Sequence, residues 1–500
     1  MNHQDILLLG AELDKTLQEN NMAQAKDIVS QLEPHYEARS QEFAVSNQLT
    51  IALSLAKYFR KRNQYDKSAH YSRQAIQQAK IGKLGLTRPL VDAYLNYAKL
   101  EKDYNQIDNA RKLLATLLMQ LEKNKVEDNY IFGLVYHLLA QIGFQDLAFD
   151  TAVEQFKEAL TCFRKAIPEE HPIIYQTINE LTETYIRMEH YQDALYLQEK
   201  TLQDYQKTDD KLTQALILLR MGEIYFYLDL KKARKAITQS LALLKALEQP
   251  VLLYQAKANL LLAELEENLA NAPRSINYYK RSLKQLEQVH EQEHFMVVYA
   301  YSKIGTLLMK VNQLEDAKYY LEKGLPLTKG HSRIQMQFLY ALGKIYSKEQ
   351  SYEQARNLYQ AFLDQLEKAN KKQSKAYADT LQAIGFNFIQ QNDMEKAFIC
   401  YQEAIDIYQG LRPVSKDSLG FASIRLAYCY EQKAEKDIAK ASEWYQYGVE
   451  QIEKLKDKAL SEEALAAVID FYQRHDFPKQ QSYYENKLVK LQVNSREVLS

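Results

Sequence analysis

One small residue recurs along almost the whole chain at a nearly constant interval. It is alanine or serine in every clear case, and successive copies lie 38 to 44 residues apart, most often 42. We call these residues the anchors: Ala25, Ser68, Ala110, Ala152, Ala194, Ala233, Ser275, Ala317, Ala355, Ala397 and Ala441. Repetition at a fixed period is typical of a chain that builds one supersecondary unit many times and stacks the copies.

A second small or medium residue usually stands twelve positions before the anchor. Clear cases are Ala56, Ala98, Ala140, Thr182, Ala263, Gly305, Gly343 and Gly385, and in two repeats it is displaced, to Gly222 and Ala427. Both small residues lie among apolar residues at helical spacing, so a repeat is interpreted as two amphipathic helices that approach closely. The turns between them are predicted near Asn63, Tyr104, Leu147, His190, Asp229, Asn271, Asn312, Gln350, Asp393, Glu435 and Asp476.

Composition agrees with an all-α fold. Fourteen Gly and nine Pro are few among 500 residues, and the prolines fall mostly at predicted helix ends. Pro326 is expected to shorten the second helix of its repeat. No stretch shows the β-branched alternation of a strand. A chain of this length needs no large central core if each repeat packs only on its neighbours.

The paired small residues, together with an aromatic residue that often follows three positions later, resemble the tetratricopeptide repeat. The interval of 42 exceeds the usual length of about 34, and such long repeats are similar to those of kinesin light chains and of Gram-positive Rap-like peptide receptors. The resemblance implies a right-handed α-solenoid of about eleven to twelve helical hairpins. It predicts an N-terminal capping helix pair at 1–40, the solenoid at 41–492 and a C-terminal tail at 493–500.

Charge and cysteine content indicate the cellular compartment and the kinds of partner. Sixty-four Lys and Arg against sixty-five Asp and Glu give a net charge of −1, which argues against nucleic acid as a partner. The N-terminal apolar run is too short for a signal sequence, and no window approaches the ~20 apolar residues that span a bilayer. Three dispersed cysteines fit a reducing compartment. We therefore expect a cytoplasmic protein with no membrane partner, and nothing indicates a homo-oligomer.

The stretch His290–His294 reads HEQEH and matches the H-E-x-x-H pattern of zinc peptidases. That chemistry needs both histidines on one face of a helix and a third ligand, whereas this match straddles the junction between two predicted helices. We interpret it as an exposed loop. No other catalytic motif is present, so the sequence predicts no catalytic residue, no metal site, no cofactor and no enzyme.

The resemblance implies that the first helix of each repeat lines a concave groove. The groove-facing places are then three before and one, four and five after the first small residue. They nominate nine binding residues: Lys57, Lys99, Gln141, Asn179, Glu183, Arg187, Glu223, Tyr227 and Lys344. The groove is expected to be basic, then acidic, then basic again along the chain, an order that favours an extended partner of matching charge.

Two functions remain open at this stage. The first is a non-catalytic scaffold or adaptor that holds a protein or an extended peptide. The alternative is a signalling-peptide-gated cytoplasmic regulator resembling the Rap class, without a DNA-binding domain, because residues 1–40 contain no basic recognition helix. The Lys and Asn pattern of carboxylate-gripping chaperone co-factors is not repeated, so that role is disfavoured.

Overall fold

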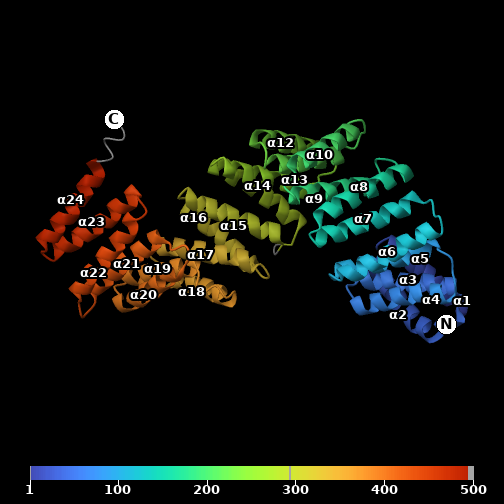
Figure 1. Ribbon diagram of the computed structural model, residues 1–500, viewed down its shortest axis with the longest axis horizontal. Coiled ribbons are helices and arrows are strands. Elements are labelled where there is room, and N and C mark those ends of the chain that lie inside the picture. Colours follow the sequence, from blue (N-terminus) through green and yellow to red (C-terminus); the bar gives the residue numbers. More distant parts are fainter. Residues whose placement is uncertain (1, 292–293, 494–500) are drawn as a thin grey trace. The chain divides into compact units, whose positions relative to one another are not determined.

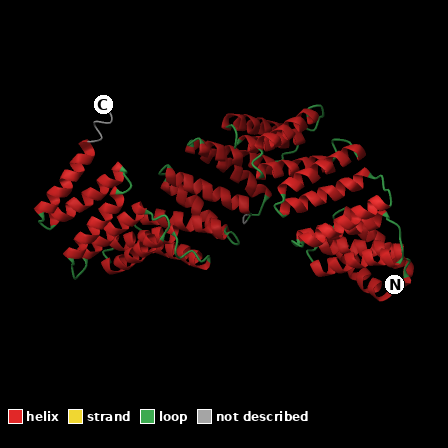
Figure 2. Cartoon of the chain, viewed as in Figure 1, coloured by secondary structure: helices red, strands yellow, loops and turns green. Residues whose placement is uncertain are grey.

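The computed structural model describes residues 2–291 and 294–493, and all its regular elements in these ranges are helices (Figures 1 and 2). The all-α fold class is confirmed. Of the predicted C-terminal tail, 493–500, only Val493 lies within the described residues.

The chain divides into two compact units, residues 1–247 and 248–500. The first unit contains α1 (His3–Gln18), α2 (Met22–Arg39), α3 (Val45–Lys61), α4 (Tyr65–Ile81), α5 (Arg88–Asp103), α6 (Ile107–Lys123), α7 (Asn129–Gln145), α8 (Phe149–Ala166), α9 (Pro172–Arg187), α10 (Tyr191–Tyr205), α11 (Lys211–Tyr225) and α12 (Leu230–Ala246), with a 3-10 turn at Ser40–Glu42.

The second unit continues the pattern of paired helices. It contains α13 (Leu252–Asn268), α14 (Ala272–Val289), α15 (Phe295–Lys310), α16 (Leu314–Gly324), α17 (Ser332–Lys348), α18 (Tyr352–Lys368), α19 (Lys375–Gln390), α20 (Met394–Gly410), α21 (Lys416–Gln432), α22 (Ile438–Glu453), α23 (Lys458–Arg474) and α24 (Pro478–Val493). The helix α16 is shortened as expected, because the 3-10 turn Leu325–Leu327 around Pro326 replaces its last turn.

A tight turn joins the two helices of each pair, and every predicted turn position is confirmed. In most pairs one turn residue is left-handed, for example Asn63 with φ 56° and Asn312 with φ 60°. Asparagine tolerates this conformation better than most residues. The amide of Asn63 donates to the Arg60 carbonyl at 3.0 Å and that of Gln64 to the Phe59 carbonyl at 2.9 Å. These bonds satisfy the carbonyls that the end of α3 would otherwise leave free.

The small residues lie where the helices of a pair approach, as the spacing predicts. A Cβ atom on Gly305 would lie 2.4 Å from Cγ of Leu321, and one on Gly343 would lie 2.6 Å from the Tyr359 ring. In two pairs a serine anchor adds a hydrogen bond across the contact. The Ser68 hydroxyl donates to the Ala56 carbonyl at 2.9 Å, and the Ser275 hydroxyl donates to that of Ala263 at 2.7 Å.

Stacking of successive pairs gives each unit an inner face. The odd-numbered helices of neighbouring pairs contact one another, as α3 does with α1 and α5 and as α17 does with α15 and α19. Over the described parts of the chain, the even-numbered helices make no comparable contact. The odd-numbered helices therefore line the tighter, concave side, which we call the inner face of each unit.

A buried carboxylate fastens α21 to α23 in the second unit. The side chain of Glu431 is only 2% exposed and accepts two hydrogen bonds from Arg474, both at 2.9 Å, and lies 3.1 Å from the His475 ring. Burial alone would raise the pKa of Glu431, but the hydrogen bonds and charges of Arg474 and His475 outweigh burial and lower it. The ion pair thus links two successive repeats.

Replacement of Gly305 by alanine is expected to destabilise the second unit, because the added methyl group meets the buried Leu321 and overpacking costs about 1–3 kcal/mol. The matched control is Gly410→Ala, since a Cβ there meets nothing within 4 Å. The control should be neutral or slightly stabilising, because alanine favours helix by up to ~1 kcal/mol over glycine. Chemical unfolding of both variants measures the difference, and equal stabilities would contradict the assigned close contact.

Replacement of Arg474 by methionine should cost about 3–5 kcal/mol at neutral pH, because the buried Glu431 carboxylate loses both hydrogen bonds and the charge of the guanidinium, although its contact with His475 remains. The lowered pKa means that the wild-type pair stabilises the fold above the ordinary glutamate pKa of about 4.3. That stability is lost as the pH falls through the folded-state pKa of Glu431. The difference in free energy of unfolding between wild type and Arg474→Met should therefore become smaller in acid.

The control is Lys458→Met, which removes an exposed pair with Glu462 at 3.7 Å and should cost at most ~1 kcal/mol. Unfolding curves from pH 7 down to pH 3 test both expectations. If the loss of free energy of unfolding in Arg474→Met stays the same at every pH, the ionised Glu431 does not stabilise the fold through Arg474.

Candidate protein-binding surface

A row of polar side chains crosses the inner face of the first unit from one odd-numbered helix to the next. It begins between α1 and α3, where the Lys57 amine lies 3.0 Å from the Asp14 carboxylate. The Lys61 amine, one turn further, donates to the Leu17 carbonyl at 2.8 Å. Both lysines thus bind the preceding repeat.

The row continues through α5 to α7. Arg60 donates from Nε to Oδ1 of Asn96 at 3.0 Å, and Lys102 donates to Oε1 of Gln141 at 3.1 Å. Between these contacts lies Lys99, which forms no hydrogen bond or ion pair with any residue that the structure describes. Partial withdrawal from water, with the nearby charges of Arg60 and Lys102, lowers the pKa of the Lys99 amine.

Between α7 and α9 the contacts centre on a carboxylate. Gln141 donates from Nε2 to both oxygens of Glu180, at 3.0 and 2.9 Å. The buried His137 ring lies 2.9 Å from the Thr177 hydroxyl and 3.3 Å from Glu180. Burial lowers the pKa of His137, although the Glu180 charge acts in the opposite direction.

Arg220 of α11 ends this row. Its guanidinium lies 2.5 Å from Glu183 of α9 and 2.5 Å from Glu223, and Glu183 also accepts from Arg187 at 3.0 Å. Burial alone would raise the pKa of Glu183, but the hydrogen bonds and charges of Arg220 and Arg187 outweigh burial and lower it. The acidic residues predicted here thus enclose an arginine.

Among the described residues, three hollows lie on the inner faces of the two units. In the first unit one of about 280 Å³ is lined by Lys57, Arg60, Lys99 and neighbours on α1, α3, α5 and α7, and one of about 410 Å³ by Lys102, Gln141 and Glu180. In the second unit a hollow of about 710 Å³ lies over α13, α15 and α17 and includes Lys344. Hollows of this size accommodate the side chains of a bound peptide.

The nine nominated residues fall into three groups. The first group makes contacts within the chain. Four of its members contact other residues of the polar row: Lys57, Gln141, Glu183 and Glu223. Arg187 binds Glu183, and the side-chain Oδ1 of Asn179 accepts from Gln198 at 3.3 Å. Lys99 and Lys344 line hollows without a carboxylate partner in the described chain. Tyr227 lies in the turn after α11 and stacks on Tyr191 at 4.6 Å.

The sequence rule missed the place two residues before the first small residue. Asn96, Glu180 and Lys303 occupy it and line the three hollows. Each is a polar residue inside an apolar helical stretch, which is a signal that the sequence does contain. Arg220 stands at the same place, two residues before Gly222, and was missed for the same reason.

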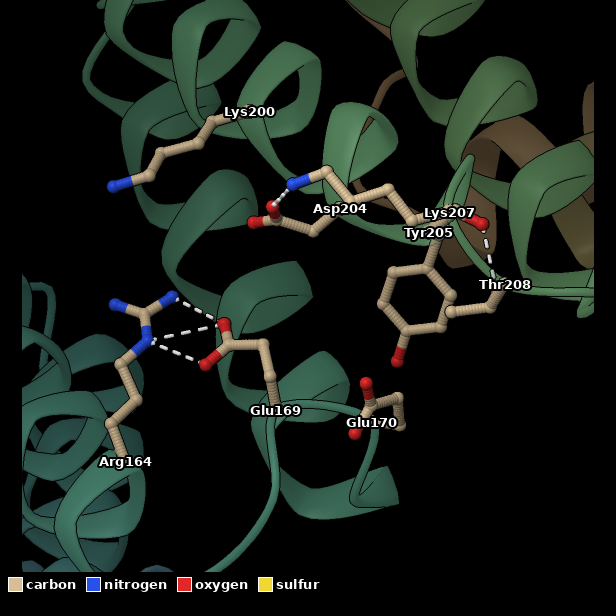
Figure 3. Close-up of a pocket in the computed structure, with 8 residues that line it drawn as sticks. All are labelled: Arg164, Glu169, Glu170, Lys200, Asp204, Tyr205, Lys207 and Thr208. Carbon is tan, nitrogen blue, oxygen red and sulfur yellow. Dashed lines mark hydrogen bonds and ion pairs between the residues drawn. The ribbon is translucent and has the colours of Figure 1, made fainter.

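A fourth hollow, of about 540 Å³, lies at the loop edge of the first unit (Figure 3). There Arg164 donates to both oxygens of Glu169, at distances down to 2.7 Å, and Lys207 binds Asp204 at 3.0 Å. The lining comes from the ends of α8 and α10 and the loops that follow them. Most of its charges are already paired, and it is not continuous with the inner polar row.

The HEQEH segment joins α14 and α15. The His290 and His294 rings stack with centroids 3.7 Å apart, and Nδ1 of His294 accepts from the Met296 amide at the start of α15. Gln292 and Glu293 lie outside the described residues. Within residues 2–291 and 294–493, no group of three or more His, Cys, Asp or Glu side chains is placed to hold a metal ion. No helix in these ranges is long and apolar enough to cross a membrane.

Comparison with known proteins agrees with this architecture. Residues 335–410, which cover most of α17 to α20, match the tetratricopeptide repeat family model. The match spans two successive helix pairs, α17 with α18 and α19 with α20. The anchors Ala355 and Ala397 lie within it, so the period that they share with the other repeats extends the same helical pattern along both units.

Several solved structures resemble the chain. The apo form of RapI is 12% identical, with 82% of this chain and 98% of that chain covered, and a TM-score of 0.44. The apo quorum sensor NprR from B. thuringiensis is 13% identical, with 73% and 98% covered and a TM-score of 0.43. A signal transduction ATPase with a tetratricopeptide repeat sensor from Pyrococcus horikoshii is 14% identical, with 93% and 65% covered and a TM-score of 0.46. The search of curated proteins finds no match.

Removal of both imidazoles of the HEQEH segment, by His290→Ala with His294→Ala, should leave the fold and every partner unchanged. Stoichiometric zinc binding needs three or four ligands in tetrahedral geometry, and two stacked rings do not supply them. Metal analysis of the purified protein tests this expectation. About one zinc per chain, lost in the double variant, would overturn it.

Proposed function

We propose that this chain is a non-catalytic scaffold that binds other proteins on the inner faces of its two units. The observation that carries the proposal is the presence of hollows on the odd-numbered helices of both units, lined by charged and amide side chains. Tetratricopeptide-type repeats stack without a central core, so the inner face is the extended surface that the fold offers to a partner.

The state of the cysteines supports a non-catalytic role. Burial raises the pKa of the Cys400 thiol to about 11 and that of the Cys429 thiol to about 12. The pKa of Cys162 is raised for the same reason. Thiolates, not thiols, are the nucleophilic form of cysteine, so these residues are poor nucleophiles at neutral pH and act as packing groups.

A protein or extended peptide is the partner that this surface favours. The hollows alternate along the inner face with paired side chains such as Glu183 and Arg220, which hold neighbouring repeats together. An extended chain can place side chains in successive hollows along the inner face of a unit. Affinity then depends mainly on the few side chains that fill these hollows.

The finer alternative is a regulator whose partner binding is controlled by a short signalling peptide. The long repeat period and the hollows of a few hundred Å³ are compatible with it. The two functions differ in one observable. A small peptide from the native source should change the affinity for the protein partner in the regulator and leave it unchanged in the scaffold.

The test begins with capture of partners from the native cytosol by the full chain, identified by mass spectrometry. Lys99→Glu should then weaken binding of the captured partner by about tenfold, or ~1.4 kcal/mol, because it reverses the charge of an unpaired group in a hollow. The fold should survive, since the new carboxylate relieves repulsion with Arg60 and Lys102.

The matched control is Lys123→Glu at the exposed end of α6, an even-numbered helix. It makes the same change of charge away from the inner face and should leave the affinity within about twofold, since exposed charges contribute little. Titration of wild type and both variants with the captured partner measures the three affinities and tests whether the inner face binds that partner. Equal losses in both variants would exclude the inner face as the binding surface.

A further inference from the structure

The hollow of the second unit has an excess of positive charge. It is lined by four lysines and one carboxylate: Lys303, Lys310, Lys344, Lys348 and Glu267. We call it the lysine hollow, and it lies over α13, α15 and α17, which are labelled in Figure 1. Four lysines against one glutamate give the lining three more basic than acidic side chains.

Glu267 neutralises only one side of this hollow. Its carboxylate lies 3.0 Å from the Lys303 amine and 3.9 Å from that of Lys310, and it also accepts from the Tyr279 hydroxyl at 3.3 Å. Lys344 and Lys348 are exposed and have no carboxylate within ion-pair distance in the described ranges 2–291 and 294–493. The α17 side of the lysine hollow therefore presents two uncompensated cations.

The floor of the lysine hollow is apolar and firmly held. Met309, Tyr340, Ala341 and Tyr359 contribute to its lining. The Tyr340 ring packs at 5.9 Å from that of Tyr359, which is only 1% exposed, and the Lys344 amine lies 4.9 Å above the Tyr340 ring. An apolar side chain can be buried on this floor while carboxylates reach the amines at its rim.

We propose that the lysine hollow binds an acidic peptide segment that contains an apolar side chain. The inference rests on the proposed function and adds the chemistry of the partner. Charge complementarity selects carboxylates for the rim, and the apolar floor selects a hydrophobic anchor between them. A volume of about 710 Å³ holds several side chains.

A peptide fits this surface better than a nucleic acid does. A phosphate backbone needs a continuous basic stripe, whereas Glu267 of α13 borders the lysines and binds Lys303. A polyanion would meet this carboxylate, while a short acidic segment can end before it. Gln337, Thr306 and Ser347 add neutral groups that can bond a peptide backbone.

The experiment titrates the full chain with a fluorescein-labelled peptide of glutamates around a central leucine and follows its fluorescence anisotropy. Lys344→Glu with Lys348→Glu should weaken binding by at least about tenfold, because each reversal turns an attraction into a repulsion. The control, Lys368→Glu with Lys371→Glu, changes the charge equally on exposed residues outside the hollow and should stay within about twofold. Binding should also weaken as salt rises.

Further arms separate the possible outcomes. Glu267→Gln should tighten binding by about threefold, because it removes a competing carboxylate. Replacement of the central leucine by glycine should weaken binding, and equal affinity would exclude the apolar floor from the site. If the reversed variant does not fold, Lys344→Gln with Lys348→Gln replaces it and should show a smaller loss.

Equal affinity of the acidic peptide for wild type and the Lys344 and Lys348 variants would overturn the proposal. So would equal binding of a peptide with lysines in place of the glutamates. If a labelled oligothymidylate binds more tightly than the peptide, and its binding depends on the same lysines, then the ligand of the lysine hollow is a nucleic acid and the proposal is wrong. These results are independent of the Lys99 test on the first unit, which concerns the captured partner.

Discussion

The close approach of two helices at paired small residues is the constraint on which the rest of the structure depends. At Gly305 there is no room even for a methyl group beside Leu321, and at Ala56 the carbonyl lies within 2.9 Å of the Ser68 hydroxyl. Because the anchor and its partner recur with the same spacing, each repeat has nearly the same internal geometry. Neighbouring repeats within a unit then stack in a similar way, which brings odd-numbered helices such as α1, α3 and α5, or α15, α17 and α19, together on the inner face of that unit.

Tyrosine side chains join the stacked repeats because the ring fills the gap between helices while the hydroxyl reaches a carboxylate of another helix. The Tyr65 hydroxyl donates to Glu101 at 2.9 Å, and burial together with this bond raises the Tyr65 pKa to about 12. Tyr71 donates to Glu37 at 2.7 Å in the preceding repeat. Thirty-seven tyrosines against seventeen phenylalanines reflect this arrangement, since a thin stack of repeats leaves few positions away from a polar partner.

The helices and their turns could be predicted from the sequence because they follow from local spacing, and the inner face was predicted from the resemblance to the tetratricopeptide repeat. Asn63 and Asn312 stand at turns for a local reason, since asparagine accepts a left-handed backbone. The contacts of the polar row could not be predicted, because they join residues of different repeats. Glu183 was nominated as a residue that binds a partner, yet it binds Arg220, which lies 37 residues further along the chain. Arg220 stands two residues before Gly222, a place that the rule for groove-facing residues did not include.

The inner face therefore contains two kinds of charged residue with different consequences. Glu183 and Arg220 bind each other across two repeats, so they fix neighbouring repeats, and removal of either would break the only ion pair between these two side chains' helices that this row contains. Lys99, Lys344 and Lys348 have no such partner in the described chain and contribute little to its stability. An uncompensated cation in a hollow gains more from an added carboxylate than a paired one does, because no existing bond must break first. Recognition is thus expected at the unpaired lysines, and the paired charges between them hold the repeats that position those lysines.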